Sequence, residues 1–339
     1  MTATVKPNLT LIGIGAMGSL FGARLAPIAN VSLLGNWPQQ LEAIQQNGLT
    51  LIEPNGRIFT QPIHATNNIT EIQLADIVLI MVKSHQTEHA AQQAKLLLAP
   101  HGIVLTLQNG IGNLETLTAV LSKQAVALGI TSEGATIVEP GTVRHAGWGH
   151  TDLASTPETA VQIASIAQLL EQAGFQVTIR HEVDGLVWGK LAVNAGINPL
   201  TALLGVPNGF LAEHDQARAI MIAAANEVAQ VAQAQNIQLP FPDAGQRALE
   251  VAQATAANHS SMLQDIQRGA KTEIEVICGA VVKYGQKLNV PTPINTLLLT
   301  KIKECEELQP VVGQAQSNPE NILRNLQSLS RRLQISKPS

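Results

Sequence analysis

The first half of the chain alternates short apolar runs with stretches in which apolar residues recur at helical spacing. The apolar runs are rich in Leu, Ile and Val, as buried strands are, and they occupy residues 9–15, 31–34, 76–82, 102–108, 125–131 and 175–180. Helical periodicity fills segments between them, at residues 16–29, 87–99 and 157–174. Strands that alternate with helices predict βαβ units, and therefore an α/β domain with a parallel sheet. The glycine-rich stretch 133–153 is interpreted as an antiparallel hairpin added to that sheet.

Strand patterns fade near residue 183, where long, Ala-rich segments with a period of 3.6 residues take over. The clearest of these segments are residues 219–237, 245–258 and 273–289. The sequence therefore predicts two domains, a sheet-containing one over 1–182 and an all-helical one over 183–325. Residues 326–339 are expected to fray.

Composition narrows the possible partners and location. Hydrophobic residues make up 45% of the 339 residues, charged residues only 14%, and the formal net charge is −4, so we expect no nucleic-acid partner. We find no cleavable signal peptide and no apolar run long enough for a bilayer, and we expect a soluble cytoplasmic protein without a membrane partner. Cys278 and Cys305 are interpreted as reduced thiols. The Ala-rich helices do not determine the oligomeric state, and a homodimer stays possible.

A glycine-rich loop follows the first predicted strand. Gly13, Gly15 and Gly18 have the spacing G-x-G-x-x-G, between an apolar strand and a helix. In that context the first glycine permits a tight turn, the second lets backbone approach a pyrophosphate, and the third lets helix pack on strand. A plain strand–helix turn is the alternative. We favour a dinucleotide, and hence a Rossmann-type domain.

The segment after the second strand leaves the choice of dinucleotide open. An acidic residue there indicates NAD, and an arginine indicates NADP. This chain has Asn36 and Trp37, in "LLGNWPQQ", and neither charge.

Three polar residues form one stripe on an apolar segment, "WGKLAVNAGINPLTAL". Lys190, Asn194 and Asn198 are four residues apart, which places them on one side of a helix. A lysine on an apolar stripe is desolvated, and this lowers its pKa toward the range of a general acid. Two alternatives stay open: Lys190 extends to solvent, and Asn198, which precedes Pro199, ends the helix.

"HQTEH", residues 85–89, matches the H-x-x-E-H pattern of a class of zinc proteases. The segment follows a strand of the predicted nucleotide-binding sheet, and no third ligand is evident. We therefore expect no metal.

Taken together, these segments resemble the ketopantoate reductases (2-dehydropantoate 2-reductases). The likeness runs in order from about residue 9 to 310. The matching segments are "GIGAMGSLFGARLA", "VKSHQT", "LQNGIGN", "WGKLAVNAGINPLTAL", "SSMLQDIQRGAKTEIEVICGAVV" and "LNVPTPIN".

The resemblance implies an NADPH-dependent reductase of 2-dehydropantoate that forms (R)-pantoate for pantothenate and coenzyme A synthesis. It implies that Lys190 is the general acid and that Glu273 is its partner at the substrate. The residues it assigns to substrate binding are Asn109, Asn194, Asn198 and Ser261. The residues that we expect at the cofactor are Gly13, Gly15, Ala16, Met17, Gly18, Asn36, Lys83 and Asn109.

One segment departs from the family pattern. The family often carries an arginine after the second strand, which holds the 2′-phosphate of NADP, whereas "GNWPQQ" has none. Asn36, Lys83 and backbone groups are the remaining candidates for that role, and NADP(H) stays favoured over NAD(H). Three alternatives stay open. Glu273 could be a solvated helix residue. The protein could act on another 2-oxo or 2-hydroxy acid, or it could be a non-catalytic dinucleotide sensor.

Overall fold

The computed structural model describes residues 6–122 and 125–308, which divide into two compact units. The first unit contains residues up to 108 and residues 112–183, and the second contains residues 109–111 and those from 184 onward. The predicted end of the helical domain, 309–325, and the predicted frayed tail, 326–339, lie outside the described residues.

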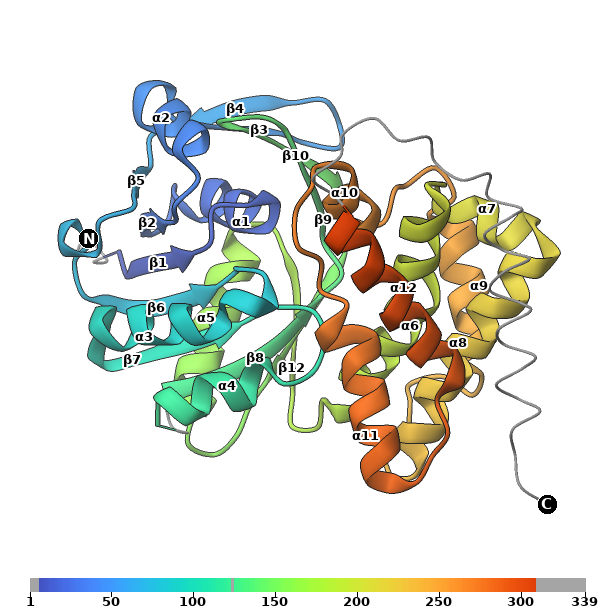
Figure 1. Cartoon of the computed structure of the whole chain (residues 1–339). Helices are drawn as coiled ribbons and strands as arrows, with labels where there is room; N and C mark the ends of the chain where they lie inside the picture. Colours follow the sequence, from blue (N-terminus) through green and yellow to red (C-terminus); the bar gives the residue numbers. More distant parts are fainter. Residues whose placement is uncertain (1–5, 123–124, 309–339) are drawn as a thin grey trace, which may run out of the picture. The chain divides into compact units, whose positions relative to one another are not determined.

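The first unit is built on an eight-stranded sheet (Figure 1). Its strands, in spatial order, are β12 (Gln176–Arg180), β11 (His150–Ala154), β8 (Val126–Thr131), β7 (Leu98–Thr106), β6 (Ala75–Ile80), β1 (Asn8–Ile12), β2 (Asn30–Leu34) and β5 (His64–Thr66). The six strands from β8 to β5 are parallel, as predicted, and β11 joins β8 in the antiparallel direction. The order β5-β2-β1-β6-β7-β8 is that of a Rossmann-type sheet.

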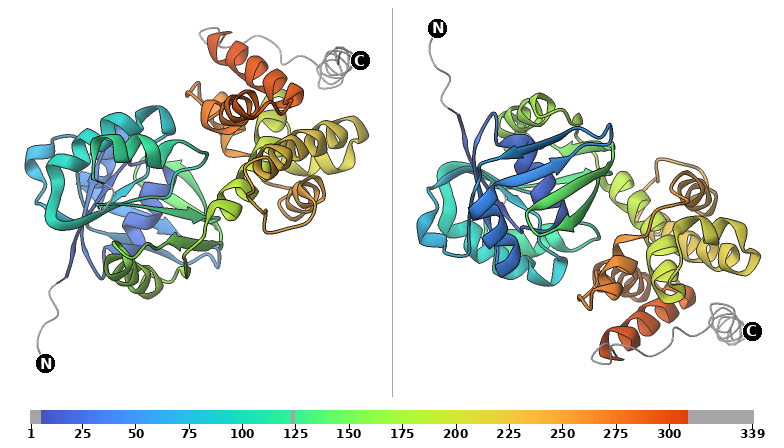
Figure 2. Two further views of the ribbon diagram at one scale, coloured as in Figure 1. Left: turned by 90° about the horizontal axis from the view of Figure 1, so that it is seen from below. Right: turned by 90° about the horizontal axis from the view of Figure 1, so that it is seen from above.

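Helices cover both faces of this sheet, so its central strands bury apolar side chains on both sides. In β6, Ile77 and Leu79 belong to one core, and Val78 and Ile80 belong to the other. The helices are α1 (Ala16–Leu25), α2 (Pro38–Asn47), α3 (Thr87–Leu97), α4 (Asn113–Val120) and α5 (Ala160–Gln172), with 3₁₀ turns η1 (Ile69–Glu71) and η2 (Ser84–Gln86). Figure 2 shows α5 on the opposite side of the sheet from α3 and α4.

A second, four-stranded sheet lies in the same unit. Its order is β4 (Ile58–Gln61), β3 (Leu49–Ile52), β10 (Thr142–Gly147) and β9 (Gly134–Glu139). The predicted antiparallel hairpin is present as β9 and β10, but the prediction that it extends the parallel sheet is wrong. Instead, β10 pairs in the parallel direction with β3, and Thr142 lies opposite Thr50. Only β11, the last part of the stretch, joins the large sheet.

Buried ionic groups link this small sheet to α1. The Arg24 guanidinium donates to Glu53 Oε1 and to His145 Nδ1, at 3.1 Å each. His145 Nε2 lies 2.7 Å from Glu133 Oε2, and both side chains are fully buried. Because a guanidinium only donates, His145 accepts at Nδ1 and donates from Nε2 to the carboxylate. His145 is thus part of the structural framework of the unit.

The regular elements described in the second unit are all helical, as predicted. They are α6 (Asp184–Leu204), α7 (Asn208–Glu213), α8 (Asp215–Gln233), α9 (Ala244–Ala254), α10 (Ser261–Gln267), the π-helix η4 (Glu275–Gly279), α11 (Ala280–Leu288) and α12 (Pro293–Leu308). A single core of small and aliphatic side chains lies between them, in which Ala192, Ala195, Ala224 and Ala225 of α6 and α8 are fully buried. Alanine at these positions lets the helix axes approach closely.

A buried carboxylate fixes the start of α12 against α8. Glu227 accepts hydrogen bonds from the backbone of Ile294 at 2.7 Å and of Asn295 at 2.8 Å, and burial raises the pKa of Glu227. It thereby satisfies donors that a helix start leaves unpaired. Cys278, whose thiol pKa burial also raises, and Cys305 are both free thiols, in agreement with the sequence.

Candidate functional site

The glycine loop has the geometry that each of its glycines predicts. Gly13 has a φ of +117°, and a Cβ there would lie 2.7 Å from the backbone carbon of Met81. A Cβ on Gly18 would lie 1.8 Å from the carbonyl oxygen of Gly13, so α1 packs on the end of β1 without room for a side chain. A Cβ on Gly15 would meet nothing within 4 Å. Gly15 is therefore the position at which backbone faces open space.

The same loop presents the N-terminus of α1. Gly15 is the N-cap, no side chain caps the helix, and its first turn, which begins at Ala16 and Met17, holds no acidic residue. Backbone N–H groups and the positive end of the helix dipole favour an anion at such a position. The open cradle at Gly15 fits a dinucleotide pyrophosphate.

Asn36 and Lys83, which are also predicted to contact the cofactor, lie at the same edge of the sheet, whereas Asn109 belongs to the second unit. Because β2, β1 and β6 are adjacent and parallel, the loops after them emerge at one edge. The loop after β2 carries Asn36, which is exposed, and the loop after β6 carries Lys83, which is partly buried at the start of η2. The described structure thus brings the glycine loop, Asn36 and Lys83 to one end of the sheet.

In the helical unit, the polar stripe lies along α6. Lys190 and Asn194 are partly buried, and Asn198 is 8% exposed. The helix continues through Pro199 to Leu204, so the alternative that Asn198 ends the helix is wrong.

Lys190 is the ionisable group of this stripe. Burial lowers its pKa to about 8, and the negative charge of Glu273 opposes part of that effect. Glu273 is 5% exposed, so the alternative of a solvated helix residue is wrong for it. Its Oε2 accepts a hydrogen bond from Asn109 Nδ2 at 3.2 Å. An ammonium with a lowered pKa beside a buried carboxylate is suited to general-acid chemistry near neutral pH.

The two adjacent serines at the start of α10 have different surroundings. Ser261 is the first residue of α10 and is exposed. Ser260 is buried, caps α10 through the N–H of Leu263, and accepts a hydrogen bond from Thr201 of α6 at 2.7 Å. Sequence reasoning missed Ser260 as the serine that ties α10 to α6; its place directly before the helical segment was the available signal.

The "HQTEH" segment does not form one helix, since His85 lies in η2 and His89 in α3. Among the described residues, no group of three or more His, Cys, Asp or Glu side chains is arranged to hold a metal ion. In the same part of the chain, no helix is long and apolar enough to cross a membrane.

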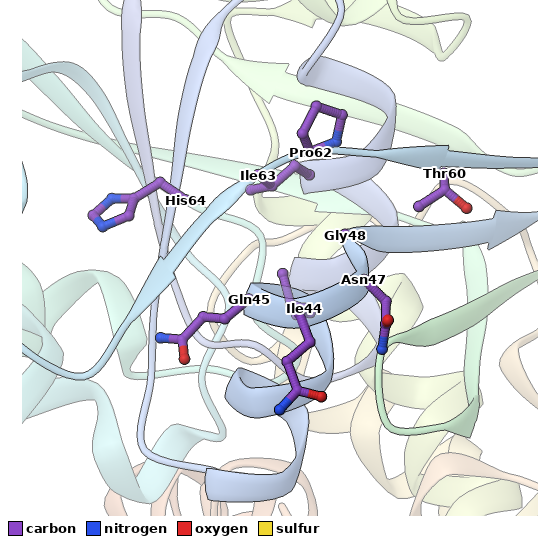
Figure 3. A pocket seen from close by; sticks show the side chains of 9 residues that line it. Ile44, Gln45, Asn47, Gly48, Thr60, Pro62, Ile63 and His64 are labelled. Atoms are coloured by element: carbon purple, nitrogen blue, oxygen red, sulfur yellow. The ribbon is translucent and has the colours of Figure 1, made fainter.

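A cavity of about 510 Å³ lies elsewhere in the first unit, beside the end of α2 (Figure 3). Residues 44–48, Thr60 and residues 62–64 line it, and none of the predicted site residues does. His64 is its only ionisable side chain. This cavity therefore lacks the paired acid and base groups that are seen around Lys190.

Comparison with known proteins identifies similar chains along most of the length. A sequence model described as "Ketopantoate reductase PanE/ApbA" matches residues 9–158, and its C-terminal counterpart matches residues 182–306. A curated 2-dehydropantoate 2-reductase of Halobacterium salinarum is 36% identical, over 83% of this chain and 93% of its own.

Two solved structures have similar folds. A PanE/ApbA family ketopantoate reductase from Ralstonia eutropha has a TM-score of 0.82 and 32% identity, covering 90% of this chain and 100% of its own. A D-mandelate dehydrogenase, solved with NADH and anilino(oxo)acetate, has a TM-score of 0.83 and 25% identity with the same coverage.

Proposed function

This chain belongs to the ketopantoate reductase family, and from that premise we propose that it reduces 2-dehydropantoate to (R)-pantoate, with NADPH as the hydride donor and Lys190 as the general acid. The similarity to this family confirms the predicted family and the predicted class, an NAD(P)H-dependent oxidoreductase. The product would serve pantothenate and coenzyme A synthesis.

The observation that carries the proposal is the environment of Lys190. Reduction of a 2-oxo acid adds a hydride to C2 and a proton to the C2 oxygen. The nicotinamide supplies the hydride when bound, and the Lys190 ammonium supplies the proton. A pKa of about 8 leaves Lys190 charged at neutral pH and yet acidic enough to donate.

The neighbouring polar groups supply orientation in this proposal. Glu273 keeps the lysine charged and accepts a hydrogen bond from a substrate hydroxyl. The amides of Asn194 and Asn198, in line with Lys190 on α6, offer neutral donors and acceptors to a small hydroxylated oxo acid, as do Asn109 and Ser261.

Turnover tests the proposal directly. The oxidation of NADPH and of NADH on addition of 2-dehydropantoate is followed by absorbance, with 2-oxoisovalerate, which lacks the hydroxymethyl group that carries the 4-hydroxyl, as the control substrate. We expect rapid oxidation with 2-dehydropantoate and faster turnover with NADPH. Buried polar groups left unpaired by 2-oxoisovalerate should reduce its kcat/KM strongly. Equal rates with both acids would contradict the substrate assignment, and faster oxidation of NADH would contradict the cofactor assignment.

The pH dependence should follow Lys190. A general acid is active when protonated, so kcat/KM is expected to be level below about pH 8 and to fall about tenfold per pH unit above it. Glu273→Gln removes the charge that raises the pKa of Lys190, and the descending limb should move to lower pH. A profile that stays level to about pH 10, the ordinary lysine range, would contradict the role of Lys190.

A second candidate is the oxidation of a 2-hydroxy acid with NAD. The observation that favours it is the fold shared with the D-mandelate dehydrogenase solved with NADH, together with the lack of an arginine near Asn36. Reduction of NAD by mandelate, in the absence of turnover of 2-dehydropantoate, would establish it in place of the first.

A further inference from the structure

We propose that Gly110 and Val276 are positioning residues, which seat the turn 109–111 on the π-helix η4 so that Asn109 holds Glu273 in place. The proposal rests on the proposed function, since it assigns a purpose to that function's Lys190–Glu273 pair. It concerns contacts within the second unit, to which residues 109–111 belong.

A backbone hydrogen bond fixes the end of the turn. The N–H of Ile111 donates to the carbonyl oxygen of Val276 at 3.1 Å. Val276 lies inside η4, where the bond from Gly279 N to Ile274 O, at 3.0 Å, spans five residues as in a π-helix. Such wider turns occur frequently at functional sites, where they redirect carbonyl groups and side chains.

Close contact at Gly110 makes this seat specific. A Cβ on Gly110 would lie 2.5 Å from both the carbonyl oxygen and Cγ2 of Val276, and the φ of Gly110 is +83°. A side chain at this position would collide with Val276, and residues other than glycine rarely adopt a positive φ. Only glycine lets the turn lie against η4.

The seat has a chemical consequence because its first residue reaches the acid–base pair. Asn109 Nδ2 donates to Glu273 Oε2 at 3.2 Å, and Glu273 is the carboxylate whose charge acts on Lys190. A turn displaced from η4 would release this hydrogen bond. Glu273 would then regain rotamer freedom and spend more time away from the ammonium, which would weaken their attraction.

The chain offers a matched pair of variants to test this. Gly110→Ala introduces a methyl group that collides with Val276. Gly112→Ala introduces the same group at a φ of +106° with nothing within 4 Å, so it carries the backbone strain without the collision. We would measure kcat/KM, and separately titrate Lys190 by NMR in protein labelled with ¹³C-lysine, assigning its signal with Lys190→Arg.

For Gly110→Ala we expect kcat/KM to fall about tenfold or more, and the pKa of Lys190 to fall by about 0.5, in the direction expected for Glu273→Gln. Gly112→Ala should stay within about threefold of wild type, with the pKa of Lys190 unchanged. Equal losses in both variants would overturn the proposal, since strain alone would explain them. A loss of activity in Gly110→Ala with an unchanged pKa of Lys190 would also overturn it.

Two features keep the test decisive. If Gly110→Ala fails to fold, Asn109→Ala removes the donor without altering the turn, and an unchanged pKa of Lys190 there would overturn the proposal. The NMR titration needs no substrate. A wild-type protein without activity on 2-dehydropantoate would refute the proposed function, while the titrations of the variants would still test the positioning role.

Discussion

Replacement of Lys190 by alanine is expected to reduce kcat by a factor of ~10²–10⁴, the usual contribution of a positioned general acid. Lys190 is the ionisable residue of the α6 stripe, and burial lowers its pKa to about 8. Without it, the C2 oxygen would have to take its proton from water. The affinity for NADPH should change little, because the residues predicted to bind the dinucleotide, apart from Asn109, belong to the first unit.

Single-turnover measurement of NADPH oxidation would separate the chemical step from cofactor release. Lys287→Ala is the matched control, since it removes an exposed lysine from the last turn of α11 in the same unit. Thermal unfolding of both variants would identify any general loss of structure. Turnover of Lys190→Ala within about threefold of wild type would contradict the general-acid role.

The α6 stripe was predictable because its signal is local. An apolar segment interrupted every fourth residue by a polar one determines both the helix and the shared side of Lys190, Asn194 and Asn198. The glycine loop was predictable because its spacing lies between a strand and a helix that are adjacent in the sequence. Its close contacts are only partly local, since Gly18 approaches Gly13, whereas Gly13 approaches Met81 and Val82 just beyond β6.

The four-stranded sheet was not predictable in this way. Its central pairing joins Thr50 to Thr142, about 90 residues apart, and no local pattern in either strand specifies its partner. The choice between the two sheets depends on β3 and on the contacts with Arg24 of α1, which only the folded unit brings together.

The site was predictable in its residue types and less so in its arrangement. The resemblance named Asn109 and Glu273, but periodicity gives no sign that the turn 109–111 is seated on a π-helix. That contact depends on Gly110 and Val276, which are 166 residues apart and have no polar or ionisable side chain. The wider turn of η4 likewise arises from packing, since "EIEVICGAVV" has an ordinary helical pattern.

Gly18→Ala and Gly15→Ala are expected to separate stability from cofactor binding. A Cβ on Gly18 would lie 1.8 Å from the carbonyl oxygen of Gly13, so α1 would have to move away from β1. Overpacking of this severity should cost about 3 kcal/mol or more and lower the Tm by about 6–12 °C. Gly15 has a φ of −73° and open space around it, so alanine fits there without a collision. Because alanine is a poorer N-cap than glycine, the substitution should cost about 1 kcal/mol or less and lower the Tm by no more than about 4 °C.

Gly15→Ala, which should affect stability less than Gly18→Ala, is expected to have a direct effect on NADPH affinity. In the proposed complex the backbone at Gly15 approaches the pyrophosphate, and the methyl group of Gly15→Ala would occupy that space. The loss of a charge-assisted hydrogen bond should then weaken NADPH binding by about 10–100-fold. Gly147→Ala, at another open glycine of the same unit, is the matched control, and its affinity should equal that of wild type. Fluorescence titration with NADPH and thermal unfolding measure both quantities on each variant. Wild-type affinity in a stable Gly15→Ala protein would show that the dinucleotide does not lie against this loop, and with it the assignment of the first unit as the cofactor domain would fail.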